Sequence, residues 1–166
     1  MRALRLFAQL LLYLPLMAVI GFFSSRPRFE VIAPDEALVR ISFVHAAERL
    51  RPCRERTPEE LARLAPNMRL ALDCPRERAP VLFEMELNGQ VILRRSLRPS
   101  GLGRDGAAAF HHRMAVPAGH HRLVLRLRDR AEGDFNHVHE ATVTLAPGAG
   151  LLVDFVAAQG GFQLRG

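Results

Sequence analysis

Seven histidines are the residues of this sequence best suited to binding a metal ion. His137 and His139 flank Val138 in a segment that alternates like a β-strand, so their imidazoles are expected on one face, about 7 Å apart. Two imidazoles at that spacing can share one ion, and imidazole suits copper, zinc and nickel. The pair is therefore a candidate metal-binding feature.

A turn at residues 117–119 extends this candidate set. It would bring His111 or His112 near His121 on the next strand, and the thioether of Met114 would suit Cu(I). The candidate copper ligands are His112, His121, His137 and His139. The alternative is that all of these are ordinary polar side chains at strand ends and hairpin shoulders. Because no Cys-x-x-Cys or His-x-x-x-His motif accompanies them, we predict no resident cofactor.

Cys53 and Cys74 are the only two cysteines of the chain. Two cysteines are too few for a closed structural zinc site, which normally takes four ligands. An even number in a chain that begins with an export-type segment predicts one disulfide outside the cytoplasm. The alternative is a pair of unbonded buried thiols. A disulfide closing a loop of about 20 residues contributes roughly 3 kcal/mol by the chain-entropy argument, which is sufficient reason for the cysteines without redox chemistry.

Catalytic patterns are weak or absent in this sequence. Gly101, Gly103 and Gly106 spell Gly-x-Gly-x-x-Gly, but no strand-to-helix context surrounds them, so we interpret the match as accidental. Glu84 and Glu86 share one face of a predicted strand, where we interpret them as solvent-exposed side chains rather than an acid–base pair. No Gly-x-Ser-x-Gly motif is present. We therefore do not expect an enzyme.

The N-terminus carries a hydrophobic segment of membrane-spanning type. Residues 6–23 include Gln9 as the one strongly polar side chain, and as a helix they would be about 27 Å long, near the lower limit for crossing a bilayer. A cleaved signal peptide is the alternative, with Val19-Ile20-Gly21 as a poor cleavage site. We predict a retained anchor over residues 1–23, contacting lipid through residues 6–23, and a linker over residues 24–36.

The expected location follows from the cysteines more than from the flanking charges. Arginines lie on both sides of the apolar segment, so the positive-inside rule does not decide the orientation. The predicted disulfide places the C-terminal domain outside the cytoplasm. We predict a single-pass protein of the inner (cytoplasmic) membrane with residues 37–166 in the periplasm.

Residues 37–166 read as successive strands interrupted by one excursion. Alternation of apolar and polar side chains predicts strands, for example at residues 39–43, 123–127 and 151–155. At residues 46–79 this alternation stops, and Thr57-Pro58-Glu59-Glu60 has capping-box spacing for a short helix ending near Leu64. We predict an all-β fold: an antiparallel Ig-like or transthyretin-like sandwich of about seven strands with a helical flap over residues 46–79.

Asn88-Gly89 predicts the sharpest hairpin of this fold. A three-residue turn with Gly89 in the left-handed region would set Met85 opposite Val91 and Phe83 opposite Leu93. We favour that register over a two-residue turn, because it pairs apolar side chains.

Two segments resemble small extracytoplasmic β-sandwich modules. Residues 116–125, Val-Pro-Ala-Gly-His-His-Arg-Leu-Val-Leu, resemble their strand–turn–strand unit, and residues 145–155, Leu-Ala-Pro-Gly-Ala-Gly-Leu-Leu-Val-Asp-Phe, resemble their hairpin. The families they resemble are the PEGA-type and transthyretin-like (carboxypeptidase-regulatory-like) modules. The resemblance covers about a quarter of the chain and implies a sandwich fold and a tethered, non-catalytic role.

The basic balance of the chain does not indicate nucleic-acid binding. All 23 cationic residues are arginines, and residues 1–28 hold four of them and no acidic residue, so they account for most of the net charge of +6. Arg122, Arg126 and Arg128 form a stripe on one predicted strand, a candidate surface for an anionic partner whose alternative is a solvated face. Aromatic side chains do not intersperse with them, so base-stacking platforms are not expected.

These observations predict a non-catalytic accessory or assembly subunit of the periplasm. Its expected partner is an integral membrane or periplasmic protein complex, such as a respiratory complex, and not a nucleic acid. The alternative function is a periplasmic copper-binding or copper-delivery protein that uses the candidate histidines.

Overall fold

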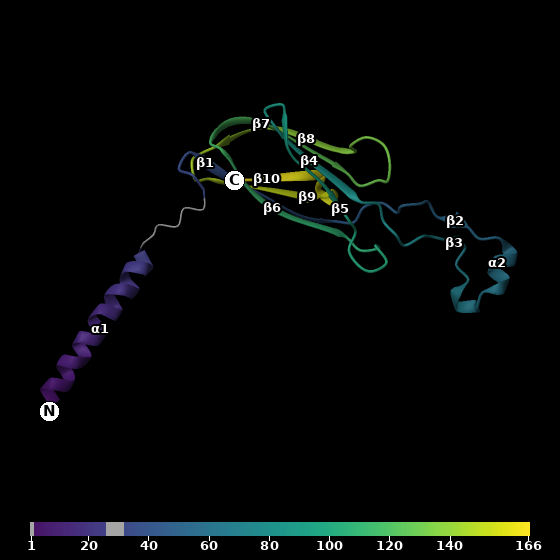
Figure 1. Cartoon of the computed structure of the whole chain (residues 1–166). Helices are drawn as coiled ribbons and strands as arrows, with labels where there is room; N and C mark the ends of the chain where they lie inside the picture. The colour runs from purple at the N-terminus through teal and green to yellow at the C-terminus, as the bar shows by residue number, and fades with distance from the viewer. Residues whose placement is uncertain (1, 26–31) are drawn as a thin grey trace. The chain divides into compact units, whose positions relative to one another are not determined.

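The computed structural model describes residues 2–25 and 32–166, which belong to two compact units, Met1–Ala33 and Pro34–Gly166 (Figure 1). The first unit contains the helix α1 (Arg2–Ser25), with Pro15 inside it. Its mean hydropathy reaches 2.1, and it is long and apolar enough to span a membrane. The predicted anchor is thus a helix that continues two residues beyond position 23. Of the predicted linker, residues 26–31 lie outside the described residues, and strand structure begins at Glu36.

The second unit consists mainly of two four-stranded sheets. The first sheet has the order β10-β9-β1-β6 and contains β1 (Glu36–His45), β6 (Ala108–Pro117), β9 (Gly150–Val156) and β10 (Gly161–Arg165). The second sheet has the order β5-β4-β7-β8 and contains β4 (Val81–Leu87), β5 (Gln90–Leu97), β7 (Gly119–Arg128) and β8 (His137–Leu145). Two short 3₁₀ helices complete the unit, η1 (Pro66–Met68) and η2 (Ala157–Gln159).

Both sheets contribute to one hydrophobic core. The alternation predicted from the sequence is observed: Val39 and Ile41 of β1, Phe83 of β4 and Leu125 of β7 are buried with almost no solvent exposure. The edge strand β10 contacts β8, and the edge strand β5 contacts β6. The mostly β structure with two sheets is compatible with the predicted sandwich.

One strand pair departs from the predicted antiparallel arrangement. β1 and β9 run parallel, with Leu38 opposite Gly150 and Ile41 opposite Val153, while the other pairs within the two sheets are antiparallel. A parallel pair needs a long connection between its strands. Here most of the unit lies between β1 and β9, so no crossover helix is required.

The predicted register of the β4–β5 hairpin is wrong. Asn88 and Gly89 both have positive φ, 52° and 85°, and form a two-residue turn with Leu87 opposite Gln90. The register shifts by one residue at a bulge between Met85 and Glu86. The residue left unpaired is Ile92 of β5, so Phe83 lies opposite Arg95 and not opposite Leu93, and the bulge increases the local twist.

Residues 46–79 contain the predicted short helix within a longer excursion. They form an arm that Figure 1 shows beyond the ends of the strands, with the two-residue strands β2 (Arg54–Glu55) and β3 (Leu72–Asp73) and the helix α2 (Pro58–Arg63). The helix makes up only six residues of the arm. The two sides of the arm meet in a short antiparallel ribbon, in which β2 pairs with β3.

Candidate interaction site at the disulfide-closed arm

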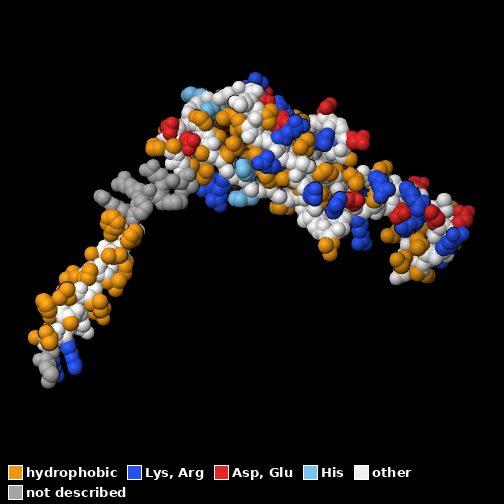
Figure 2. Space-filling view, viewed as in Figure 1, with side chains coloured by type: hydrophobic (Ala, Val, Ile, Leu, Met, Phe, Trp, Pro, Cys, Tyr) orange, Lys and Arg blue, Asp and Glu red, His pale blue; other side chains and the backbone are white. Residues whose placement is uncertain are grey.

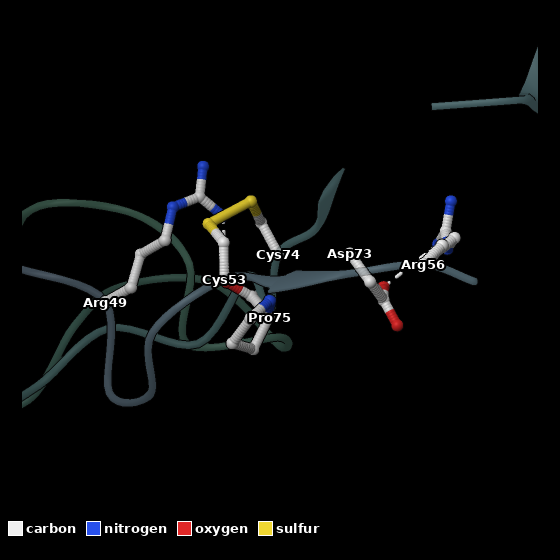
Figure 3. The surroundings of a disulfide bond; sticks show 6 residues. All are labelled: Arg49, Cys53, Arg56, Asp73, Cys74 and Pro75. Carbon is white, nitrogen blue, oxygen red and sulfur yellow. Dashed lines mark hydrogen bonds and ion pairs between the residues drawn. A yellow bond between two sulfur atoms is a disulfide. The ribbon is translucent and has the colours of Figure 1, made fainter. Parts of the chain in front are cut away.

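A disulfide joins the two sides of the arm. Cys53 and Cys74, 21 positions apart, are bonded immediately beside the pair formed by Arg54 and Asp73, which confirms the predicted disulfide (Figure 3). Arg49 Nη1 donates to the carbonyl oxygen of Pro75 at 2.8 Å on the same segment. The disulfide therefore holds a ribbon that has only two pairs of ladder residues of its own.

The outer part of the arm is ordered by local polar contacts. The predicted capping box is confirmed: Thr57 Oγ1 accepts the N–H of Glu60, and the Glu60 carboxylate accepts the N–H of Thr57. Hydrogen bonding from the Thr57 N–H, followed by that from Arg54, holds the pKa of Glu60 below its usual value. Arg54 contacts Glu60 at 3.0 Å and Asp73 at 3.2 Å, and Arg56 contacts Asp73 at 2.9 Å. These contacts fix the arm without a buried hydrophobic core.

Apolar side chains of the arm face solvent. Met68, Leu70 and Leu72 are 59%, 68% and 52% exposed, and we call these three residues the arm apolar patch. Together with Arg49, Arg56 and Arg76 they line a hollow of about 800 Å³. An exposed apolar patch beside cationic groups is typical of a protein interaction site.

The root of the arm is joined to two loops of the sheets. The N–H of Glu48 donates to the carbonyl oxygen of Asp129 at 2.8 Å. Arg78 donates to the carbonyl oxygens of Ala47 and Asp105, at 2.7 and 2.9 Å. The loop that contains Asp105 also holds Leu102, whose side chain is fully exposed. We call the arm, its root and these loops the arm end of the second unit.

A buried carboxylate links both sheets at the arm end. Asp129, which follows β7, accepts hydrogen bonds from His45 Nε2 at 2.7 Å, from His137 Nε2 at 3.3 Å and from Asn136 Nδ2 at 2.7 Å. Burial alone would raise the pKa of Asp129, but the hydrogen bonds from His45, Asn136 and His137 outweigh it and hold the pKa below its usual value. Both imidazoles also pack edge-on against Phe155. We call this group the Asp129 cluster.

The four predicted copper ligands do not come together. His112 lies on β6 and His137 and His139 lie on β8, which form opposite edges of the two-sheet stack because β6 contacts β5 whereas β8 contacts β10. His121 pairs with Val143, six residues along β8 from His137. Within residues 2–25 and 32–166, no group of three or more His, Cys, Asp or Glu side chains is arranged to hold a metal ion.

His121 has a structural environment instead. It is buried, its Nδ1 lies 2.9 Å from Asn88 Nδ2, and its Nε2 lies 2.8 Å from the carbonyl oxygen of Pro117. Since a carbonyl can only accept, Nε2 carries the proton and Nδ1 accepts from the amide. The ring thus connects the β4–β5 and β6–β7 turns, and both nitrogens are engaged.

The predicted arginine stripe lies on the outer face of the second sheet among carboxylates. Arg126 contacts Glu84 at 2.8 Å and Glu86 at 2.7 Å, and Arg122 contacts Glu140 at 2.5 Å. Arg128 Nη1 donates to the carbonyl oxygen of Gly133 at 2.8 Å. Glu84 is only 6% exposed, so the interpretation of Glu84 as a solvent residue is wrong. An anionic partner at this stripe remains a prediction, and it would compete with three carboxylates already in place.

Comparison with known proteins gives no relative: no family model, curated protein or solved structure matches the chain. The arm apolar patch and the Asp129 cluster were not predicted from the sequence. For the patch, a signal was present, because Met68, Leu70 and Leu72 alternate between the two cysteines. For the cluster there was none, because His45 and Asp129 are 84 positions apart.

Proposed function

We propose that this chain is a membrane-anchored, non-catalytic accessory or assembly subunit whose arm binds an integral membrane or periplasmic protein complex, such as a respiratory complex. The observation that carries the proposal is the arm apolar patch, which is exposed although the disulfide, the capping box and three ion pairs order the arm around it. Apolar side chains that stay exposed bury little surface and so contribute little to the stability of the arm itself. Such a patch is typical of a surface that a partner protein covers.

The position of the arm along β1 agrees with this role. β1 begins at Glu36, next to the segment that leads to α1, and ends at His45, where the arm begins. Ten residues of strand extend about 33 Å, so the arm root and the tether are at opposite ends of β1. A partner could therefore be engaged at the arm end while α1 remains in a membrane.

The proposed location is the inner membrane, with α1 as a single span and the second unit in the periplasm. Its supports are the apolar helix α1 and the disulfide, because disulfides persist in oxidising compartments such as the periplasm.

For the fold we infer the transthyretin-like arrangement rather than the Ig-like one. A constant-type Ig domain has seven strands in sheets ABED and CFG, so its second and third strands belong to different sheets. Among the eight strands of the two sheets, the second and third, β4 and β5, pair in one hairpin. This strand order supports the resemblance to transthyretin-like modules.

Affinity purification of the full chain from detergent-solubilised membranes tests the proposed function. We expect a stoichiometric partner with the wild-type chain, and its loss when Met68→Ser, Leu70→Ser and Leu72→Ser are combined. Val138→Ser is the matched control, because Val138 is a 60% exposed apolar residue on β8, outside the arm. A chain that always migrates alone, or an arm variant that retains the partner as the control does, would contradict the proposal.

A further inference from the structure

Three arginines form one row across the outer face of the first sheet. Arg40 on β1 lies directly opposite Arg113 on β6; on its other side, Leu152 of β9 lies opposite both Arg40 and Arg165 of β10. All four side chains alternate with buried core residues and so share the outer face. With strands about 4.8 Å apart, the row extends about 14 Å. We call Arg40, Arg113 and Arg165 the arginine row.

No carboxylate among the described residues neutralises the charges of the arginine row. None of the three arginines forms an ion pair with any residue of the described ranges 2–25 and 32–166. Arg113 Nε donates instead to Nε2 of His111 at 3.4 Å. The acids on this face are Glu36 at the start of β1 and Asp154, whose carboxylate accepts the N–H of Phe155 at 2.7 Å. Like charges directly opposite each other destabilise a sheet, so the pair of Arg40 and Arg113 costs stability.

The outer face of the second sheet shows the opposite arrangement. There Arg126 meets Glu84 and Glu86, and Arg122 meets Glu140. Alternation on β7 is visible within one segment of the sequence, whereas the arginine row combines residues of three strands, β1, β6 and β10. Figure 2 shows arginine (blue) and histidine (pale blue) side chains gathered beside β6, with no acidic (red) side chains among them.

We propose that the arginine row binds the phosphate groups of anionic lipids and lays the outer face of the first sheet against a membrane surface. A guanidinium donates two parallel hydrogen bonds to a phosphate, and a row of three on a sheet face matches an array of head groups. Leu38, Leu152 and Val44 lie on the same face, and Val44 is 68% exposed. This mixture of arginine and aliphatic side chains suits the membrane interface.

The covalent tether favours lipid over a free anionic partner. Residues 26–35 separate α1 from β1, and ten residues extend at most about 35 Å. If α1 lies in a bilayer, head groups are present near the arginine row at a high effective concentration. This inference relies on the membrane anchoring of the proposed function and not on the partner of the arm, so either can fail alone.

Energy transfer from a tryptophan reporter tests the lipid contact. The chain has no tryptophan, so Ala115→Trp, on the outer face of β6, gives a unique donor on the first sheet, and Thr142→Trp gives one on the outer face of the second sheet. The full chain is placed in nanodiscs of phosphatidylcholine, with or without phosphatidylglycerol, that contain dansyl-labelled lipid. We expect phosphatidylglycerol to increase transfer from Ala115→Trp and not from Thr142→Trp.

A charge-matched pair of variants decides whether the arginine row is responsible. Arg40→Gln, Arg113→Gln and Arg165→Gln together should abolish the increase, with about a five-fold weaker association for each arginine removed. The control variant combines Arg95→Gln, Arg98→Gln and Arg130→Gln, which removes the same charge from exposed arginines elsewhere. In this variant, phosphatidylglycerol should still increase the energy transfer. Circular dichroism verifies that both triple variants are folded.

Four results would overturn the proposal. Energy transfer from Ala115→Trp that does not depend on phosphatidylglycerol would exclude the lipid contact. If both triple variants lost the phosphatidylglycerol-dependent increase equally, net charge alone would explain the binding. Transfer that rises from Thr142→Trp instead would show that the second sheet faces the membrane. If lipid has no effect but the arginine-row variant loses a co-purifying acidic protein, the face binds protein, and the lipid proposal is wrong.

Discussion

At the scale of single residues, the carboxylate of Asp129 connects the parts of the arm end. It receives hydrogen bonds from His45 at the end of β1 and from His137 at the start of β8, and the Asp129 carbonyl oxygen accepts the N–H of Glu48 at the arm root. His45 belongs to the first sheet, whereas Asp129 follows β7 and His137 begins β8 of the second sheet. The Asp129 side chain therefore joins both sheets next to the segment that leads from β1 into the arm.

Removing this carboxylate should destabilise the second unit. Asp129→Ala leaves two imidazoles and an amide without their acceptor, so we expect the free energy of unfolding to fall by about 2–3 kcal/mol. Asp134→Ala, an exposed carboxylate in the same loop, is the control and should change it by less than about 0.5 kcal/mol. Denaturant titrations at neutral pH measure both, and equal effects would contradict the assigned role.

The lowered pKa of Asp129 also predicts a pH dependence. Because the folded state binds this proton less tightly than the unfolded state does, the stabilisation is complete above the unfolded pKa of about 3.9 and is lost as the pH falls through the folded pKa. Unfolding free energies measured from neutral pH into this acidic range should therefore fall more steeply for the wild-type chain than for Asp129→Ala. Parallel curves would show that another group causes the acid sensitivity.

Two arginines of the second sheet should differ strongly in their effect on stability. Arg126→Ala removes two contacts, including one to the buried Glu84, and should cost about 2–3 kcal/mol, because Glu84 keeps only the longer contact to Arg94. Arg122→Ala breaks an exposed pair and should cost under about 1 kcal/mol. Thermal and denaturant unfolding measure the two side by side. Equal costs would mean that Glu84 is not held by Arg126.

At the scale of elements, the arm depends on its disulfide more than on its own packing. β2 and β3 contribute two residues each, and α2 has no buried residue. Loop closure over 21 positions contributes roughly 3 kcal/mol to ordering such a segment. The two sheets have a separate core, so the arm and the sheets should lose structure independently.

Breaking the disulfide should therefore loosen the arm and leave the sheets intact. In a variant with Cys53→Ser and Cys74→Ser, we expect amide hydrogen exchange to accelerate across residues 49–78, while β1, β4 and β7 keep their protection. Hydrogen exchange read by mass spectrometry resolves these segments, and the wild-type chain under reducing conditions should behave like the double variant. Loss of protection throughout the sheets would show that the disulfide holds the whole unit.

The elements that were predicted from the sequence are those with local signals. The capping box of α2, the cysteine pair and the alternating strands each depend on residues close in sequence or on cysteine count. The ribbon of β2 and β3 was missed because strands of two residues have no alternation to detect. The parallel pairing of β1 with β9 and the Asp129 cluster were missed because both depend on packing between segments that are distant in the sequence.

At the scale of the whole molecule, charge and apolar surface are divided among separate regions. On the outer face of the second sheet, Arg122 and Arg126 form ion pairs with glutamates. The arginine row forms no ion pair with the described residues, and the arm exposes apolar side chains. The four arginines of residues 1–28 belong to the flanks of the apolar segment and account for much of the net charge. This division fits a protein that contacts a membrane and a partner protein through different surfaces.

Site-specific photo-crosslinking of the full chain in native membranes tests directly whether the arm binds a partner protein. A photoreactive side chain is introduced at Leu70 in the arm apolar patch or at Val138 on β8, which have similar exposures of 68% and 60%. We expect one adduct of defined mass from Leu70, identified by mass spectrometry as the same protein in repeated experiments, and none from Val138. No adduct from Leu70, or the same adduct from both positions, would contradict the claim that the arm is the partner-binding site.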